Sequence, residues 1–471
     1  MPTPSTPSAD LVIEARWVLP IAGSTPALAH HAVAIEDGRI IAVGPAPRLA
    51  ERFAARERLV RPHHALLPGL IDAHARAGTF LSPTGLRHGE LRRSGAADRA
   101  PAGVADTPAE AQWETLSAAQ RARDGATLAI AGMLLGGTTA FGTQGPDPEE
   151  IARVAARARV RASVGLPIAA ERTAWAQDAT AHLARAESLW DEYVSNPWVR
   201  FHFALDADAE LGSSDALLAR IRTVADELDA RIALPLHRSA AEVHASRVRY
   251  GKSPLERLQA LGLLRPGFIA LYGNHLDASA LDLVARTGVS IVACPRASLA
   301  RGLGACPIPE LLARGAAVAL GTGSPAAALP LDLLAEARAA ALLPGALGGE
   351  SVPLAPEQAL ETATLAGARA LGLDSAVGSI EPGKAADLIA VDLDSIECQS
   401  ASSPAEAVLY AATRDRITDV WIDGRPRVLQ GRLLAFDAEE LSAIARRSGV
   451  ALLGEDASVA LSRTRTAGVA P

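Results

Sequence analysis

Short apolar runs alternate along the middle of the chain with longer stretches in which apolar residues recur at helical spacing. Within residues 215–228, for example, a helix would gather the apolar side chains on one face, at Leu217, Leu218, Ile221, Val224 and Leu228. We therefore predict eight strands, each followed by a helical stretch: Ala65–His74, Gly136–Phe141, Arg161–Ile168, Val199–Leu205, Arg231–His237, Phe268–Tyr272, Val289–Cys294 and Ala316–Gly321.

Eight alternations of strand and helix over about 300 residues predict an α/β fold, a (β/α)₈ TIM-type barrel. An open, doubly wound sheet of the same elements is the alternative. In a barrel of this kind the functional groups lie at the C-terminal ends of the strands. Polar residues at those ends are therefore the first candidates for a site.

Both ends of the chain are predicted to form short strands around Asp-Gly turns at 37–38 and 423–424. The expected strands are Leu11–Leu19, Ala32–Ile35, Arg39–Val43, one within 384–394, Val420–Ile422 and Arg427–Leu429. The strands before residue 60 are too few to form a stable sheet alone, so they need partners from elsewhere in the chain. A helical stretch, Ala355–Leu371, precedes the C-terminal strands.

Composition limits the class of protein. The net charge of −7 comes without a basic stripe, which argues against nucleic-acid binding. No uninterrupted apolar run approaches the ~18 residues that a membrane span needs, and the start of the chain lacks the pattern of a signal peptide. The three cysteines, Cys294, Cys306 and Cys398, are scattered, as expected for a cytoplasmic protein without disulfides.

In one stretch of the chain, polar residues directly follow an apolar run. In Leu66–Gly78 the bend at Pro68-Gly69 is followed by Asp72, His74 and Arg76. Alternate residues of a strand share a face, so His74 and Arg76 are expected to point the same way at its end.

This stretch resembles the first barrel strand of the amidohydrolase superfamily, in the aminohydrolase/deaminase branch that includes triazine hydrolases and methylthioadenosine/adenosylhomocysteine deaminases. The resemblance runs from about residue 11 to 453, and its most specific stretches are Asp124–Thr139, Tyr250–Leu264 and Gly378–Asp387. It implies a barrel, a small composite β-sandwich built from both chain ends, hydrolysis of C–N bonds, and a homo-oligomer. The predicted organisation is a disordered tail at 1–10, β-sandwich parts at 11–64 and 373–453, the barrel at 65–372, and a flexible tail at 454–471.

Family enzymes hold a divalent metal with two histidines from the first strand, one each from the fifth and sixth, and an aspartate from the eighth. A glutamate after the fifth-strand histidine moves the proton. The metal lowers the pKa of a bound water so that hydroxide forms near neutral pH. Of these five ligand positions, His74 alone keeps a ligand.

The resemblance places other residues at the remaining family positions. The four other ligand positions are occupied by Arg76, Pro235, Tyr272 and Gly323, and the glutamate position by Arg238. A guanidinium is a permanent cation that cannot ligate a metal. His237 and His275 fall at rim positions. The fourth-strand turn reads Ala204–Asp208, and the family's Ser-Asn pair becomes Ala297-Ser298.

We therefore expect a pseudoenzyme: a non-catalytic homologue without a cofactor, which binds a small ligand, an anion being one option, or pairs with an active relative. Arg76 and Arg238 would either form an ion-pair plug with Asp206, Asp208 or Glu210, or an anion pocket with Arg296 or Arg301. The alternative is an active hydrolase or deaminase, acting on a purine- or triazine-like substrate, with a zinc ion displaced to His74, His237 and His275.

Other catalytic arrangements are not supported. Neither Lys252 nor Lys384 falls at a strand end, which excludes a carboxylated lysine between two metals. Cys294 precedes a proline in an apolar strand and is expected to be a buried apolar residue, not a nucleophile. The segment 87–108, where the family builds a lid, is poor in large apolar residues.

Overall fold

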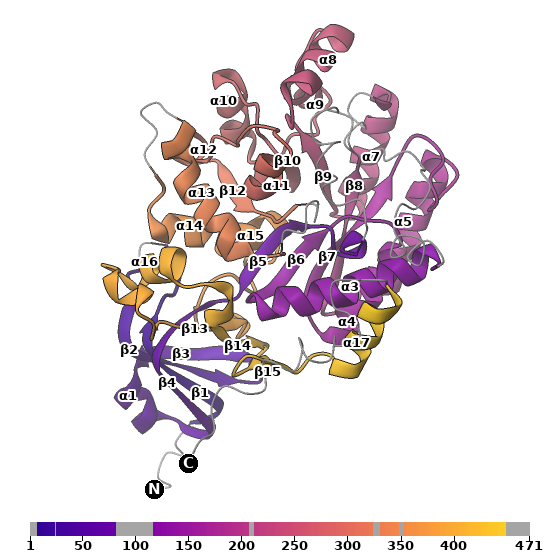
Figure 1. The fold of residues 1–471 in the computed structure, drawn as a ribbon. Helices are drawn as coiled ribbons and strands as arrows, with labels where there is room; N and C mark the ends of the chain where they lie inside the picture. Colours follow the sequence, from indigo (N-terminus) through magenta and orange to yellow (C-terminus); the bar gives the residue numbers. More distant parts are fainter. Residues whose placement is uncertain are drawn as a thin grey trace, which may run out of the picture.

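The computed structural model describes residues 7–23, 25–81, 116–206, 212–323, 330–347 and 353–448. Within these ranges the strands form two eight-stranded sheets, one closed into a barrel and one mixed sheet beside it (Figure 1). This confirms the predicted TIM-type barrel with a second, smaller domain and rules out the open doubly wound sheet. The predicted lid, the acids at 208 and 210, and the tail at 454–471 lie outside the described residues.

The barrel is built from parallel strands that neighbour one another in chain order. Its ends meet through a bridge between Ala75 and Gly323 and a 2.8 Å hydrogen bond from Gly323 N to the carbonyl of His74. The strands are β5 (Leu70–Ala75), β6 (Thr138–Thr143), β7 (Arg161–Ile168), β8 (Val199–Leu205), β9 (Arg231–Leu236), β10 (Phe268–Tyr272), β11 (Ser290–Ala293) and β12 (Ala317–Leu320).

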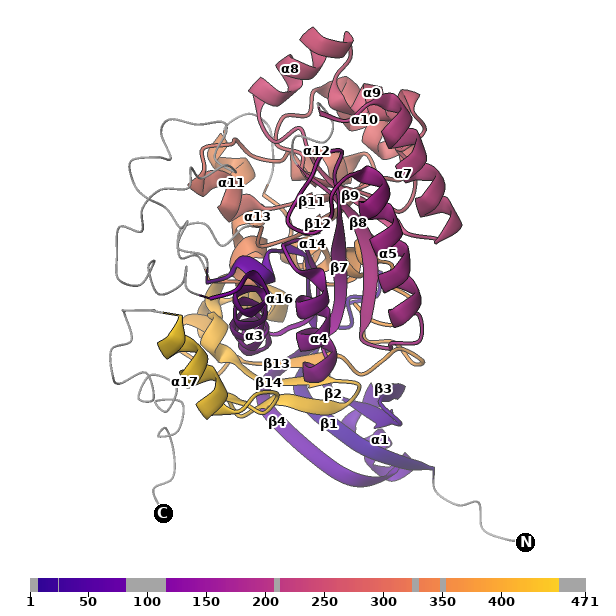
Figure 2. The ribbon, with the colours of Figure 1, turned by 90° about the vertical axis from the view of Figure 1, so that its right-hand side faces the viewer.

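Helices surround this barrel, and their apolar faces pack against the strands (Figures 1 and 2). The helix predicted within residues 215–228 is α7, and its buried side chains include three of the five expected apolar positions, Leu218, Ile221 and Val224. The helices are α3 (Ala118–Leu135), α4 (Pro148–Ala158), α5 (Ala179–Tyr193), α7 (Asp215–Glu227), α8 (Ala240–Tyr250), α9 (Pro254–Ala260), α10 (Ala278–Thr287), α11 (Pro295–Ala300), α12 (Ile308–Ala313), α13 (Leu333–Leu347), α14 (Pro356–Thr362), α15 (Leu365–Leu371) and α17 (Ala438–Arg447), with the short η1 (Ala77–Thr79).

The second sheet joins both ends of the chain, in the order β16-β15-β14-β13-β4-β1-β2-β3. Its strands are β1 (Ser8–Val18), β2 (Leu28–Glu36), β3 (Arg39–Pro45), β4 (Ala54–Pro68), β13 (Leu388–Asp392), β14 (Ile417–Ile422), β15 (Arg425–Leu429) and β16 (Arg432–Leu433). The N-terminal strands find their expected partner where β4 pairs with β13, with Pro68 opposite Leu388. The small elements α1 (Ala46–Arg52), η3 (Glu397–Ser400), α16 (Pro404–Glu406), η4 (Ala407–Ala411) and η5 (Arg414–Arg416) complete this part.

Several predicted element boundaries differ from the structure. The strand predicted at 65–74 is divided at Gly69 between β4 of the mixed sheet and β5 of the barrel. Residue 69 must be glycine, because a β-carbon there would clash with the side chain of Thr139. The helix predicted at 355–371 is two helices, because the backbone of Thr364 leaves the helical region. Its hydroxyl donates 2.7 Å back to the carbonyl of Leu360. β1 also begins at Ser8, within the expected tail.

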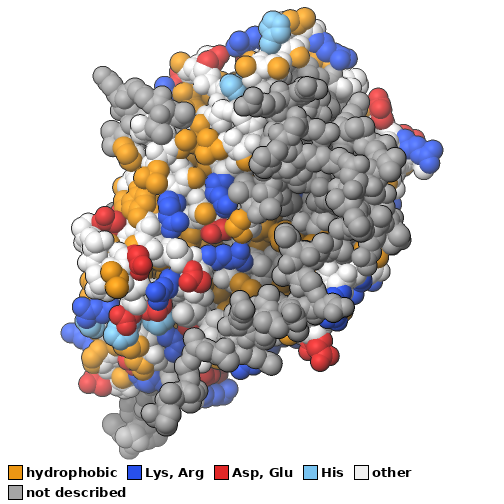
Figure 3. Space-filling view, in the orientation of Figure 1, with side chains coloured by type: hydrophobic (Ala, Val, Ile, Leu, Met, Phe, Trp, Pro, Cys, Tyr) orange, Lys and Arg blue, Asp and Glu red, His pale blue; other side chains and the backbone are white. Residues whose placement is uncertain are grey.

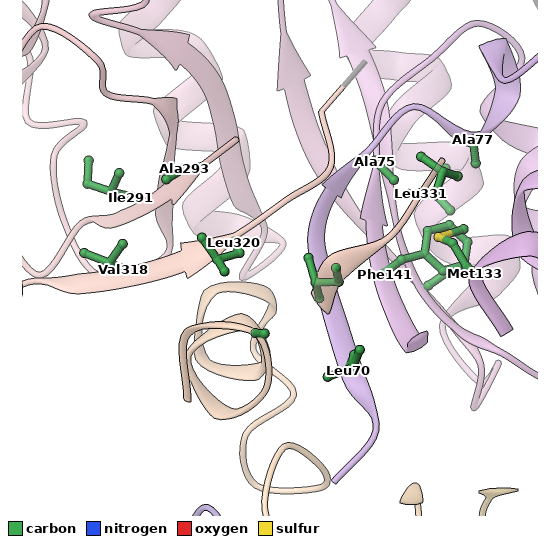
Figure 4. Close-up of a cluster of buried hydrophobic side chains, with 14 of the residues drawn as sticks. Leu70, Ala75, Ala77, Met133, Phe141, Ile291, Ala293, Val318, Leu320 and Leu331 are labelled. Atoms are coloured by element: carbon green, nitrogen blue, oxygen red, sulfur yellow. The ribbon is translucent and has the colours of Figure 1, made fainter. Parts of the chain in front are cut away.

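The core lies between the barrel strands and their covering helices. Figure 4 shows Leu70, Phe141, Met133 and Leu331 together where β5 and β6 meet helix α3. All four side chains are nearly inaccessible to solvent. This packing fixes the start of β5 and therefore the position of the polar residues at its end.

A buried ion-pair cluster joins the two domains. The guanidinium of Arg161 on β7 donates to both carboxylate oxygens of Asp387 at 2.8 and 3.3 Å and also to Asp423. On the face shown in Figure 3, acidic and basic side chains are interspersed over the mixed sheet at the lower left. No helix among the described residues is both long and apolar enough to span a bilayer.

Candidate functional site

Residues from several barrel strands meet at the C-terminal end of the barrel. His74 lies on β5, Tyr272 is the last residue of β10, and Gly323 follows β12. Pro235 lies on β9, where it pairs with Leu271, and Asp206, His237, Arg238 and His275 lie just beyond their strands. The strand ends thus bring the predicted site residues to one end of the barrel, as in other barrels of this type.

Asp72 fixes the backbone around His74. Its carboxylate is fully buried and accepts hydrogen bonds from His74 N at 3.2 Å, from Thr322 N at 3.0 Å and from the Thr322 hydroxyl at 2.6 Å. Burial raises the pKa of Asp72 to about 6 in spite of these donors. The carboxylate therefore ties β5 to the segment after β12 and holds the His74 backbone in place.

The His74 imidazole is buried in a cationic environment. Burial lowers its pKa to about 3, and the positive charges of Arg76 and Arg301 add to this effect. Burial also lowers the pKa of the neighbouring His202, to about 4, so that imidazole is neutral at pH 7. His202 on β8 is itself buried, with its Nδ1 2.9 Å from the Ser163 hydroxyl. Arg76 lies just past β5, and its Nε is buried with no hydrogen-bond partner among the described residues. The imidazole is therefore neutral at pH 7 and faces an excess of positive charge.

An aromatic ring stands beside His74 on the sixth strand. The Tyr272 ring meets the imidazole edge-on, with ring centroids 6.0 Å apart and an interplanar angle of 76°. Tyr272 is buried and has a φ of 77°, a conformation that few residues other than glycine adopt. A strained backbone conformation at a strand end marks this position as a candidate for function.

The rim of the site is organised around Glu242 of α8. Its two carboxylate oxygens accept hydrogen bonds from the backbone N–H groups of His237 at 2.9 Å and Arg238 at 3.0 Å. The Arg238 side chain lies 4.0 Å from the same carboxylate. Pairing of Arg238 or Arg76 with Asp206 across the mouth stays a prediction.

The two rim histidines have defined roles in the loops. His237 Nδ1 donates to the carbonyl of His275 at 2.7 Å, and His275 Nε2 donates to the carbonyl of Leu303 at 2.9 Å. His237 Nε2 is buried and has no partner among the described residues. Over the same residues, no three His, Cys, Asp or Glu side chains are placed to hold a metal ion together, so the arrangement of His74 with His237 and His275 is not found.

Sequence reasoning missed several supporting residues. Asn274 donates to the carbonyl of Arg238 at 3.2 Å and accepts from the Ser298 hydroxyl at 3.2 Å, which links the loops after β9, β10 and β11. Glu336 of α13 accepts from Arg296 N at 2.9 Å. The one sequence signal for Glu336 is its position as an acidic residue in a mainly apolar helix. Cys294 is buried as predicted, and burial raises the pKa of its thiol well above its usual value.

Comparisons with known proteins give a consistent assignment. The model of the amidohydrolase family matches residues 65–427. The 5-methylthioadenosine/S-adenosylhomocysteine deaminase of Teredinibacter turnerae is 34% identical over 446 residues, which cover 93% of this chain and 97% of that protein. The protein of the same name from Saccharophagus degradans is 32% identical over 443 residues, with 93% and 96% covered.

Solved structures agree with these relatives. An adenosine deaminase from Xanthomonas campestris with bound zinc superposes with a TM-score of 0.84 and 36% identity, covering 95% of this chain and 99% of that chain. The triazine hydrolase from Arthobacter aurescens superposes with a TM-score of 0.82 at 21% identity, covering 93% and 99%. At that identity the triazine hydrolase supports the fold alone.

Proposed function

Because the chain belongs to the amidohydrolase family, we propose that it is a non-catalytic member of that family whose barrel mouth binds a small anionic ligand. The observation that carries the proposal is the positive charge around His74. Arg76 and Arg301 both act on the buried imidazole, where a metalloenzyme would place a cation beside it. Fixed guanidinium groups at such a place favour an anion.

A divalent metal does not fit this environment. A site needs several neutral or anionic donors around one point. The neutral His202 is a further imidazole near His74, but the other neighbours are the Tyr272 ring and the cationic Arg76 and Arg301. A second positive charge would be repelled by Arg76 and Arg301 in a site with little water to screen it. The resemblance to family enzymes supports the same conclusion, since four of the five ligand positions carry other residues.

An active deaminase is the second candidate. Two observations favour it: the relatives named as deaminases cover nearly the whole chain, and the buried His237 Nε2 has no partner among the described residues. A displaced metal would use that nitrogen. We further propose a cytoplasmic, homo-oligomeric protein; the three free cysteines support the compartment.

Zinc content separates the two candidates. The purified chain would be loaded with zinc, desalted and analysed by elemental mass spectrometry, next to the variants His74→Ala and His237→Ala. We expect a stoichiometry near zero in all three and no turnover of 5-methylthioadenosine. About one zinc per chain that is lost in either variant would overturn the proposal, as would deamination of that nucleoside.

Anion binding at the mouth is tested separately. We expect Arg76→Gln to abolish protection of the chain by a phosphate-free dicarboxylate such as succinate in a thermal-shift assay. Arg432→Gln, an exposed change on the edge strand β16, is the matched control. Equal protection of the two variants would remove the mouth as the anion site.

A further inference from the structure

A second polar cleft lies at the opposite end of the barrel from His74. Arg159 follows α4 and precedes β7, while Trp198 directly precedes β8, so both lie at the N-terminal ends of barrel strands. With the hairpins of the mixed sheet they line a cleft of about 760 Å³. Arg425 and Arg427 of β15 line it from the sheet side.

Arg427 carries unused hydrogen-bond donors at this cleft. Its Nε and Nη2 are buried, and neither has a hydrogen-bond partner in the described part of the chain. These two nitrogens form the edge of the guanidinium that takes a bidentate oxyanion. A buried donor without a partner is unfavourable, so this edge is prepared for an acceptor that the described residues do not supply.

Three other arginines of the protein use the same two nitrogens to bind a carboxylate. Each uses Nε and Nη2 to hold both oxygens of a buried carboxylate: Arg61 with Asp419 at 2.8 and 2.9 Å, Arg161 with Asp387 at 2.8 and 3.3 Å, and Arg447 with Asp124 at 2.6 and 2.6 Å. Arg427 has the same edge but no carboxylate among the described residues. Arg427 lines the cleft, and binding of a ligand there requires its terminal torsions to turn this edge towards the cleft.

The charges around Arg427 favour an anion. Arg159 and Arg425 act on the Arg427 guanidinium, and with its burial they lower the pKa of this group. Neither of these two arginines forms an ion pair with the described residues. Asp387 and Asp423, the acids that act on this guanidinium, are already bound to Arg161, and Asp423 also lines the cleft.

The acidic residues on the opposite wall do not neutralise this group. The carboxylate of Asp10 forms an ion pair with Arg56 at 3.0 Å and accepts from Asp37 N at 2.8 Å. Glu36 accepts from the Ser8 hydroxyl. The Asp37 side chain also lines the cleft, at the tip of its hairpin. Arg159, Arg425 and Arg427 therefore form the positively charged part of a lining that also holds acidic residues.

We propose that this cleft binds a small phosphate-bearing molecule, with Arg427 as the bidentate ligand of the phosphate and Arg159 and Arg425 as further cationic contacts. A phosphate offers oxygens in several directions, which suits guanidinium groups that approach from different elements. The volume exceeds that of a bare ion, and the half-buried Trp198 ring offers a flat surface for the attached group. The site is independent of the barrel mouth.

Calorimetric titration of the full chain with inorganic pyrophosphate tests the proposal. We expect saturable binding to one site that Arg427→Gln weakens at least about tenfold, the loss of a bidentate charged contact. Arg427→Lys, which keeps the charge but not the edge, should fall between. Arg159→Asn, at an exposed residue with a φ of 52° that asparagine tolerates, should weaken binding without disturbing the fold.

Controls decide the location and the class of ligand. Arg432→Gln should bind pyrophosphate as the unaltered chain does. Absence of saturable binding would overturn the proposal. So would an affinity of Arg427→Gln and Arg159→Asn for pyrophosphate that equals that of the unaltered chain. So would loss of binding in Arg76→Gln alone, because the anion site would then be the mouth. Tighter binding of citrate than of pyrophosphate would overturn the phosphate assignment.

Discussion

The Tyr272 ring meets the His74 imidazole edge-on at a centroid distance of 6.0 Å, from a backbone with a φ of 77°. A side chain larger than glycine's in that conformation costs about 1–3 kcal/mol, so the surrounding packing must hold it there. The ring fills the space beside the imidazole and excludes water from it. His74 is thus supported by an aromatic contact and by the backbone bond to Asp72.

Loss of the Tyr272 ring should destabilise the barrel. We expect Tyr272→Ala to lower the free energy of unfolding by about 3 kcal/mol, because a buried aromatic side chain leaves a cavity. Urea denaturation measures the change. Tyr410→Ala, at a half-buried tyrosine of the other domain, should cost clearly less. Equal losses would mean that Tyr272 does not support the mouth.

Gly323 should resist even the smallest side chain. Its φ is 67°, and an added β-carbon would lie 3.0 Å from Cβ of Ala297 and 3.3 Å from Cβ of Cys294. Gly302 has a similar φ of 63°, and among the described residues no atom lies within 4 Å of an added β-carbon. A substitution there therefore measures the cost of the backbone conformation alone. We expect Gly302→Ala to cost about 1 kcal/mol and Gly323→Ala about 2 kcal/mol. The same loss of unfolding free energy in both variants would show that the contacts around Gly323 do not add to the cost.

Stability should decline as pH rises through the titration of Glu336. Burial raises the pKa of this carboxyl from 4.5 to about 8, so the folded chain binds a proton that the unfolded chain has released. The free energy of unfolding should therefore fall between about pH 4.5 and 8, by about 2 kcal/mol or more.

Denaturation curves at several pH values measure this dependence. Glu336→Gln cannot release a proton, so its stability should depend less on pH across the same window. Glu357→Gln, at an exposed position on the neighbouring α14, should follow the unaltered chain. Parallel pH curves for Glu336→Gln and the unaltered chain would show that Glu336 is ionised in the folded state.

The Arg61–Asp419 pair should stabilise the mixed sheet. Asp419 is fully buried and accepts from Arg61 Nε and Nη2 and from Gln430 N. Hydrogen bonds from Arg61 hold the pKa of Asp419 below its usual value although burial opposes this. Its contribution is therefore complete above pH 3.8 and is lost as the pH falls through the lower, folded-state value.

We expect Asp419→Asn to lower the free energy of unfolding at pH 7 by about 3 kcal/mol, because it leaves a mostly buried guanidinium without its charge partner. The exposed Asp394→Asn is the control and should change it by less than about 0.5 kcal/mol. Thermal unfolding at pH 7 and in acid measures both. A deficit that does not shrink in acid would show that the charge on Asp419 is not responsible.

Regular elements could be predicted well because their signals are local. β7, β8 and β10 have the predicted bounds, since each is a short, largely apolar run; β10, for example, lies between Gly267 and Gly273. β4 was missed over its first half, because Ala54–Val60 holds three consecutive charged residues and becomes a strand only by pairing with β1. The need for glycine at residue 69 likewise depends on Thr139, far away in sequence.

At the candidate site, the sequence indicated which residues lie at the C-terminal end of the barrel. It did not indicate which hydrogen bonds fix their positions. His74, Tyr272 and Gly323 could be placed because strand order fixes where a strand ends. The roles of Glu242 and Asn274 depend on loop conformations that bring backbone N–H and carbonyl groups within reach. The Arg427 cleft needs two domains to meet, and no local pattern predicts that.

The pairing of β4 with β13 has a consequence for synthesis of the chain. The apolar edge of β4 at residues 65–68 leaves the ribosome early, whereas its partner Leu388–Asp392 follows only after the whole barrel has been made. Until then an unsatisfied sheet edge is open to pairing with other nascent chains. Premature termination before residue 388 should therefore yield aggregates, and the last strands act as the closing step of biogenesis.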